Sequence, residues 1–165
     1  MKEVNVSEAW GRKYPEPVVM VTSIKDGKPN IIPLGWSMIT SFVPSMMAIS
    51  IGHTRYSHEI ISKGKEFVLA YPSEDMGKEV LYCGTHSGRE VDKFKETGLK
   101  SSPAKFVKPP LIKDAVANFE CKVIKQTDTG DHTIFVGEVI AAYINPEKKR
   151  RLYTLDKSRN FGGLG

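Results

Sequence analysis

The chain has 165 residues and a mass of 18.4 kDa, which suits one domain, so we expect a single domain over residues 1–165. Hydrophobic residues make up 40% of the chain and charged residues 26%, a balance that excludes a disordered chain and is sufficient for a large core. The net charge of +5 is compatible with an anionic small molecule or nucleic acid. No apolar run is long enough for a membrane helix and the first residues lack a signal core, so we expect a cytoplasmic protein with no membrane contact.

The first predicted element is a β-hairpin. β-prone runs at 17–24 and 31–34 flank Asp26 and Gly27, a dipeptide that tolerates the positive φ angles of a tight turn. The next predicted elements are a strand at 46–51, a brief helix at 57–61 that ends near Gly64, and a strand at 66–71.

The middle of the chain has helical patterns. Ser73 is a predicted helix start, followed by Met76, Val80 and Cys83 at helical spacing. The residues from Ser87 to Glu90 have the form of a capping box, which predicts a second helix with Val91 and Phe94 on one face and a stop at Gly98. Residues 100–110, with three prolines, are expected to be an irregular surface connection.

Two long strands are predicted after this connection. Apolar and polar residues alternate over 117–123, which is typical of a half-buried antiparallel strand. A turn at 129–131 precedes the apolar run 133–141, which we expect to lie centrally or at a subunit contact. Many short strands without regular β-α alternation favour an antiparallel β-barrel with short inserted helices.

The usual nucleotide-binding and hydrolase signatures are absent: there is no Gly-rich phosphate loop and no Gly-x-Ser-x-Gly elbow. Three other segments, each at the end of a predicted element, are more informative: 35–41 (GWSMITS), 50–57 (SIGHTRYS) and 83–94 (CGTHSGREVDKF). In their order, behind an N-terminal hairpin, the chain resembles the flavin reductase-like, FMN-binding split-barrel family, in particular its flavoredoxin and ferric reductase branch. The resemblance covers residues 14–143 and implies a Greek-key split barrel and a homodimer with flavin sites near the subunit interface.

The resemblance also implies a set of FMN-binding residues. The residues expected to bind the cofactor are Gly35, Trp36, Ser37, Met38, Ser50, Ile51, Gly52, Arg55, Tyr56, Ser57, Gly84, Ser87, Gly88 and Lys93. Arg55, Ser57 and Lys93 suit a phosphate, helped by the N-terminus of the helix near Ser57. The segments around Trp36 and Ser50 suit the slot and polar edge of an isoalloxazine ring.

His132 matches a histidine common in the family near the open face of the flavin, so it is the candidate catalytic residue, steering a nicotinamide or an electron acceptor. Cys83 and His86 form a weak metal pair, and we expect no metal site. The basic run 148–151 could also form a nucleic-acid-binding surface, which is a further alternative. We prefer the interpretation that it is the solvated end of a helix or strand, and we expect no nucleic-acid partner.

These features predict an oxidoreductase in which NADH or NADPH passes hydride to FMN, which then reduces free flavin, a ferric complex or a redox protein. The alternative is an FMN-binding electron carrier without efficient nicotinamide oxidation. The sequence does not separate these two functions.

Overall fold

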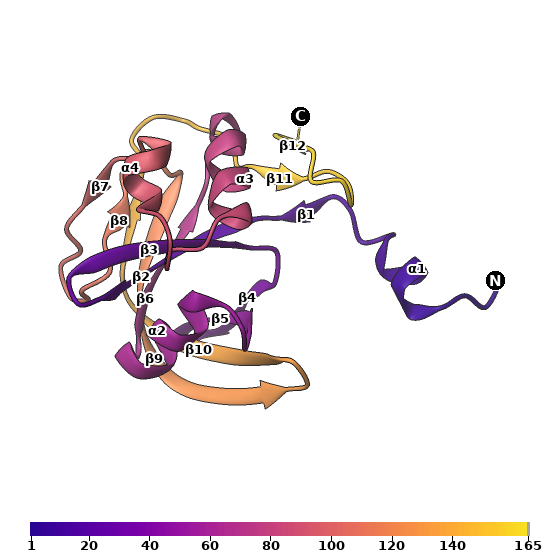
Figure 1. Cartoon of the computed structure of the whole chain (residues 1–165), viewed down its shortest axis with the longest axis horizontal. Helices are drawn as coiled ribbons and strands as arrows, with labels where there is room; N and C mark the ends of the chain where they lie inside the picture. Colours follow the sequence, from indigo (N-terminus) through magenta and orange to yellow (C-terminus); the bar gives the residue numbers. More distant parts are fainter. Residues whose placement is uncertain (165) are drawn as a thin grey trace.

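A seven-stranded antiparallel sheet forms the body of the protein in the computed structural model, which describes residues 1–164 (Figure 1). The order of its strands is β3-β2-β6-β9-β10-β5-β4. The strands are β2 (Val19–Lys25), β3 (Lys28–Leu34), β4 (Ser37–Phe42), β5 (Ser45–Gly52), β6 (Glu66–Tyr71), β9 (Ala117–Thr129) and β10 (His132–Ile144). The predicted β-rich antiparallel barrel is therefore confirmed, and the central position expected for 133–141 is that of β10, between β9 and β5.

The barrel is split because its two edge strands, β3 and β4, have no ladder between them. They are consecutive in the chain and are joined only by Gly35 and Trp36, where the sheet folds back on itself. The Ser50 N–H donates to the Trp36 carbonyl at 3.0 Å, which ties this connection to β5. The split therefore places the connection beside the end of β5 and the segment that follows it.

Residues with positive φ angles form the turn of the first hairpin and end helix α2. Asp26 (φ 51°) and Gly27 (φ 74°) both have positive φ between β2 and β3, as a tight hairpin turn requires. Helix α2 (Tyr56–Gly64) begins after Arg55 and ends at Lys65, which adopts a left-handed φ of 57°. Both elements confirm their sequence predictions.

The middle helices differ partly from prediction. Ser73 is the N-cap of a short 3-10 helix, η1 (Glu74–Met76), which leads into α3 (Gly77–Thr85). The helix predicted from Ser87 does not begin there, because residues 88–90 form a turn and the Ser87 hydroxyl accepts from the Arg89 N–H at 3.2 Å. Helix α4 (Lys93–Thr97) begins later, because the Asp92 side chain supplies its cap, and it ends at Gly98 as predicted. The loop between α3 and α4 is therefore longer than the sequence suggested.

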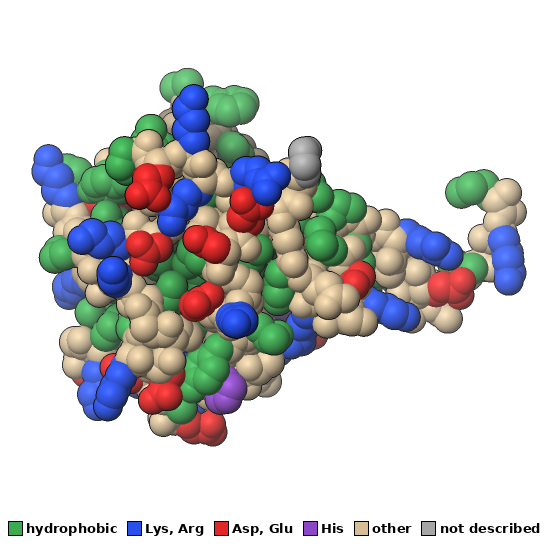
Figure 2. Space-filling model, turned by 90° about the horizontal axis from the view of Figure 1, so that it is seen from above, with side chains coloured by type: hydrophobic (Ala, Val, Ile, Leu, Met, Phe, Trp, Pro, Cys, Tyr) green, Lys and Arg blue, Asp and Glu red, His purple; other side chains and the backbone are tan. Residues whose placement is uncertain are grey.

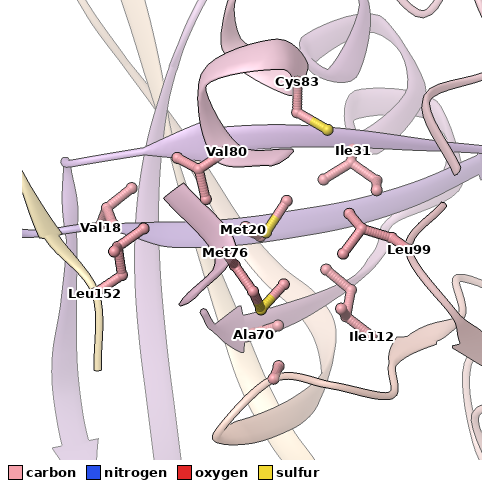
Figure 3. Close-up of a cluster of buried hydrophobic side chains, with 11 residues drawn as sticks. Val18, Met20, Ile31, Ala70, Met76, Val80, Cys83, Leu99, Ile112 and Leu152 are labelled. Atoms are coloured by element: carbon pink, nitrogen blue, oxygen red, sulfur yellow. The ribbon is translucent and has the colours of Figure 1, made fainter. Parts of the chain in front are cut away.

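The core lies in two main layers on opposite faces of the sheet. Val19 and Val21 of β2 point into the barrel, while the intervening Met20 points to the outer cluster beneath α3. Figure 3 shows Val80 and Cys83 of α3 facing this outer cluster. Period-two alternation therefore buries both faces of β2.

The connection over 100–110 is not simply a surface segment. It carries β7 (Ser101–Ser102), which pairs with β8 (Leu111–Ile112), and Val107 is buried in a third cluster with Val68 and Leu111. The polar residues at the start of β9 are therefore buried: Glu120 bonds to the connection and Asn118 bonds to Ile112 of β8. The prediction of a half-buried strand is corrected there.

The two ends of the chain meet in a three-stranded sheet of β1 (Glu16–Pro17), β11 (Tyr153–Thr154) and β12 (Phe161–Gly162). Residues 1–13, which include helix α1 (Val6–Trp10), form an arm that projects from the body (Figure 2). No helix among residues 1–164 has both the length and the apolar character needed to span a membrane.

Candidate functional site

A cavity of about 600 Å³ opens where the split of the barrel meets α2, α3 and the small terminal sheet. Most of the residues predicted to bind the cofactor lie on its wall. These are Gly35, Trp36, Ser50, Gly52, Arg55, Tyr56, Gly84, Ser87 and Gly88, together with the predicted catalytic His132. Three segments that are distant in sequence therefore meet at one site.

His132 lines the cavity and pairs with Gly52 in the β10–β5 ladder. Its ring packs against the Trp36 ring with centroids 4.8 Å apart. Nδ1 lies 2.6 Å from the Asp131 carboxylate, and this hydrogen bond lowers the pKa of Asp131. Because a carboxylate accepts, Nδ1 carries a proton, and Nε2 is the atom on the Gly52 side. A Cβ at Gly52 would come within 3.4 Å of Nε2, so glycine keeps this part of the wall open.

The start of α2 forms one end of the cavity. Arg55 is its N-cap residue and makes no side-chain cap, so the first N–H groups of the helix have no partner within it. Arg89 approaches from the α3–α4 loop: its guanidinium lies 4.8 Å from the centre of the Tyr56 ring and 3.3 Å from Glu59. This end therefore offers cationic groups and backbone donors, which suit an anion.

Behind this end, the Asn30 amide donates through Nδ2 to Ser57 Oγ at 2.7 Å. Asn30 Oδ1 is buried and has no hydrogen-bond partner among residues 1–164. A Cβ at Gly88 would overlap Oδ1, so Gly88 is needed for this close approach. Rotation of the amide by a half-turn would let Oδ1 accept from Ser57 and turn the two N–H donors toward Gly88.

Four predicted residues lie near the cavity but off its wall, and strand geometry explains three of them. Ile51 lies between two wall residues of β5, so alternation sends its side chain into the barrel, where it is fully buried. Ser37 and Met38 follow the wall residue Trp36 onto β4, where Met38 is exposed. Ser57 is buried behind the wall, bonded to Asn30.

Lys93, which was expected to bind the phosphate, also lies off the cavity wall. Its ammonium is buried and donates to the carbonyl oxygens of Ile31 at 2.7 Å and Cys83 at 2.6 Å. Burial lowers the pKa of Lys93. The side chain joins α4 to β3 and α3 instead of lining the cavity, because the helix begins at Lys93 and directs it inward.

The contacts made by Cys83, by His86 and by the basic run 148–151 do not support a metal site or a nucleic-acid surface. Cys83 is buried, and burial raises the pKa of its thiol to about 11. His86 stacks on Tyr82, and among residues 1–164 no three His, Cys, Asp or Glu side chains are grouped to hold a metal ion. In the basic run, Arg150 bonds to Glu74 at 2.9 Å and Arg151 lies 3.7 Å from the centre of the Tyr71 ring.

Several wall residues have no counterpart in the sequence predictions. They are Tyr14 and Glu16 near the first strand, Leu81, Thr85, His86 and Arg89 around the end of α3, and Thr154, Arg159 and Phe161 near the end of the chain. The terminal residues arrive by pairing of two-residue strands, which are too short to show a periodic pattern. No signal in the sequence marks them.

Comparison with known proteins agrees with this geometry. The sequence profile described as "Flavin reductase like domain" matches residues 10–164. The chain belongs to the flavin reductase-like family. An uncharacterized protein of Archaeoglobus fulgidus is 40% identical over 127 residues, which cover 77% of this chain and 71% of that protein.

Two further similar proteins have more informative names. The crystal structure of flavoredoxin from Methanosarcina acetivorans superposes with a TM-score of 0.88 at 26% identity, covering 100% of this chain and 91% of that chain. An NADH-dependent FAD reductase of Streptomyces globisporus is 28% identical over 153 residues, which cover 90% of this chain and 80% of the reductase.

Proposed function

We propose that the protein binds FMN in this cavity and passes hydride from NADH or NADPH to the flavin and on to an acceptor such as free flavin, a ferric complex or a redox protein. The observation that carries the proposal is the juxtaposition, in one cavity, of an uncapped helix start beside Arg55 with the wall formed by Trp36, Gly52 and His132. The family membership and the names of the two relatives support the same chemistry.

The α2 end of the cavity fits a phosphate. Arg55 supplies a guanidinium, and the first turn of α2 supplies backbone N–H donors. The unpartnered Asn30 Oδ1 also fits, because an anion beside Gly88 would favour the amide orientation in which the N–H donors face it. Each of these groups would bind the phosphate of FMN.

The middle of the cavity fits a flat ring. Trp36 and Gly52 provide an aromatic surface and a stretch of wall without a side chain. FMN, when bound, supplies hydride acceptance and onward electron transfer. His132 presents Nε2 on the same wall with its ring held by Asp131 and Trp36, so it would orient the second substrate.

An FMN-binding electron carrier without efficient NADH or NADPH oxidation is the second candidate function. The similarity to a flavoredoxin favours it. Both functions need the same cofactor site, so they differ only in whether a nicotinamide can bind beside the flavin.

Two measurements test the proposal in sequence. The purified protein is mixed with FMN, passed through a gel-filtration column and examined by visible absorption; we expect the two bands of oxidised flavin at about one FMN per chain. A colourless product contradicts both candidate functions.

The flavin-loaded protein is then mixed with NADH or NADPH in an anaerobic stopped-flow instrument. Bleaching of the flavin bands within seconds supports the reductase, and retention of full absorbance with both donors supports the electron carrier. His132→Gln is the informative variant, because it keeps a hydrogen-bonding side chain while removing the imidazole. We expect normal FMN loading and a slower bleaching rate.

A further inference from the structure

The terminal sheet lines the cavity and lies apart from α2 (Figure 1). Glu16 of β1 pairs with Thr154 of β11, and Thr154 pairs with Phe161 of β12. All three residues line the cavity. Because residues in register across adjacent strands face the same side, the sheet presents one continuous row to the cavity. The first and last strands of the chain therefore form a built wall that the FMN-binding proposal does not use.

Arg159 lines the cavity from the turn between β11 and β12. Its backbone has a positive φ of 63°, which is uncommon for a residue with a side chain. Asp156 fixes this turn by accepting from the Ser158 N–H at 2.8 Å and from the Asn160 side-chain amide at 2.6 Å. Arg159 is therefore held at the wall by the structure of the turn.

No carboxylate neutralises Arg159 within residues 1–164, since none of the ion pairs or side-chain hydrogen bonds there includes its guanidinium. Among residues 1–164, Glu16 is the one carboxylate on the cavity wall, and it lies 2.7 Å from Lys13 Nζ. Arg89 on the cavity wall is likewise engaged by Glu59. Within the part of the chain that the structure describes, the cavity arginines Arg55 and Arg159 thus have no acidic partner. Arg55 stands at the start of α2, and Arg159 lies in the turn between β11 and β12.

FMN carries one phosphate, which Arg55 and the start of α2 would bind. We propose that Arg159 and the terminal sheet form a second anion subsite, which binds a phosphate group of the reduced nicotinamide dinucleotide. This inference rests on the proposed function and adds the residue that holds the second substrate. A guanidinium suits this role because its planar donors bind phosphate oxygens in pairs. The role also explains how a chain without a Gly-rich loop could retain a dinucleotide.

The test compares Arg159→Asn with a matched control, Lys157→Asn. Asparagine accepts a left-handed backbone, so Arg159→Asn removes the charge without disturbing the turn. Lys157 is an exposed cation in the same turn but does not line the cavity. For each protein, FMN affinity is measured by fluorescence quenching, and binding of NAD⁺ and NADP⁺ to the FMN-loaded protein by equilibrium dialysis.

We expect Arg159→Asn to weaken dinucleotide binding about tenfold, as loss of a charge-assisted hydrogen bond implies, with FMN affinity unchanged and Lys157→Asn like the wild type. A second readout uses 1-benzyl-1,4-dihydronicotinamide, a hydride donor without phosphate, in stopped-flow reduction. The half-saturating concentration should rise in Arg159→Asn for NADH or NADPH but not for this neutral donor.

Three results would overturn the inference. Equal dinucleotide binding by wild type and Arg159→Asn would remove Arg159 from the subsite. An equal loss with the neutral donor would indicate a disturbed wall instead of a lost phosphate contact. Weaker FMN binding in Arg159→Asn would place Arg159 at the cofactor. Failure of the wild type to bind FMN is a separate outcome that contradicts the proposed function itself, and with it the subsite.

Discussion

Glu120 is a fully buried carboxylate that holds the connection over β9 in place. It accepts from the backbone N–H groups of Lys105, Phe106 and Val107 at 2.8, 2.6 and 3.1 Å, and from the Tyr143 hydroxyl. Burial alone would raise the pKa of Glu120, but the bonds from Tyr143 and the three N–H groups together lower it. The ionised form is therefore the one that the fold stabilises.

Glu120→Gln should lower the free energy of unfolding by about 2–4 kcal/mol, because the amide can accept fewer of these bonds and presents a donor to N–H groups. Urea unfolding followed by circular dichroism measures the change. Glu66→Gln is the matched control: Glu66 accepts a single N–H, from Lys108 at 3.1 Å, and we expect a loss below about 1 kcal/mol. Equal losses in the two variants would contradict the role given to Glu120.

The pH dependence follows from the direction of the shift. Because the pKa of Glu120 is lower in the folded chain than in the unfolded chain, its contribution is complete above the unfolded value, about 4.3, and is lost as the pH falls toward the folded value. The difference in stability between wild type and Glu120→Gln should therefore be constant near neutral pH and shrink below about pH 4. A difference that stays constant into that range would contradict ionisation of Glu120 in the fold.

Arg55 gives the sharpest test of the cofactor site at the level of one residue. Arg55→Glu reverses the charge beside the uncapped start of α2 and should weaken FMN binding at least about tenfold without unfolding the protein. Lys113→Glu makes the same charge change at an exposed position off the cavity wall and should leave FMN affinity near the wild-type value. Fluorescence titration with FMN measures both. If Arg55→Glu keeps full affinity for FMN, the phosphate does not bind at the start of α2.

At the scale of elements, β10 crosses the barrel interior with no room for a side chain at Gly137. A Cβ at Gly137 would come within 2.8 Å of the Phe67 ring and 2.9 Å of Cys121 Cβ. Gly137 also lies at an irregularity in the β9–β10 ladder, between Val136 and Gly137. Glycine is thus required here for close packing between strands and not for its backbone angles.

Gly137→Ala should therefore destabilise the fold by about 1–3 kcal/mol, because the added methyl group overpacks the interior. Gly64→Ala at the end of α2 is the control, since its Cβ would meet no atom within 4 Å. Thermal unfolding of the two variants gives the comparison. A melting temperature for Gly137→Ala equal to that of the control would show that the interior can absorb the methyl group.

The elements with local signals were predictable from sequence, and those defined by distant contacts were not. The Asp26-Gly27 turn and helix α2 carry their own turn and cap residues. The start of β9 was predicted to be half-buried because it is polar on one face, but that face is buried by the connection that folds over it. Strand β4 was missed since its apolar residues are exposed and show no inward-facing pattern.

The candidate site shows the same division. The segments named by the family resemblance line the cavity, but the resemblance could not determine which of their side chains face it. Alternation along β5 separates Ser50 and Gly52 from Ile51, and the late start of α4 buries Lys93. Arg159 reaches the wall only through pairing of the chain termini. Within the segments that the resemblance identified, the register of the strands and the first residue of each helix therefore determine which side chains line the cavity.

At the scale of the whole molecule, four large apolar residues close together in the chain are exposed. Met38, Ile39, Phe42 and Val43, on β4 and the turn that follows it, are 59%, 58%, 84% and 93% exposed. This set, which we call the β4 surface, begins two residues after Trp36 of the cavity wall. A cluster of large apolar residues on an edge strand is costly to leave in water and favours association.

We therefore predict a homodimer formed through the β4 surface, with the cavity close to the contact. Phe42→Asp should shift the protein to monomer in light scattering coupled to gel filtration, because it places a charge in an apolar contact. Ile144→Asp is the control, since Ile144 is 83% exposed but lies at the far end of β10, outside the β4 surface. A dimer that persists in Phe42→Asp but dissociates in Ile144→Asp would move the interface to the end of β10. Because the β4 surface adjoins Trp36, the monomeric variant should also bind FMN more weakly than the control, which links assembly to the cofactor site.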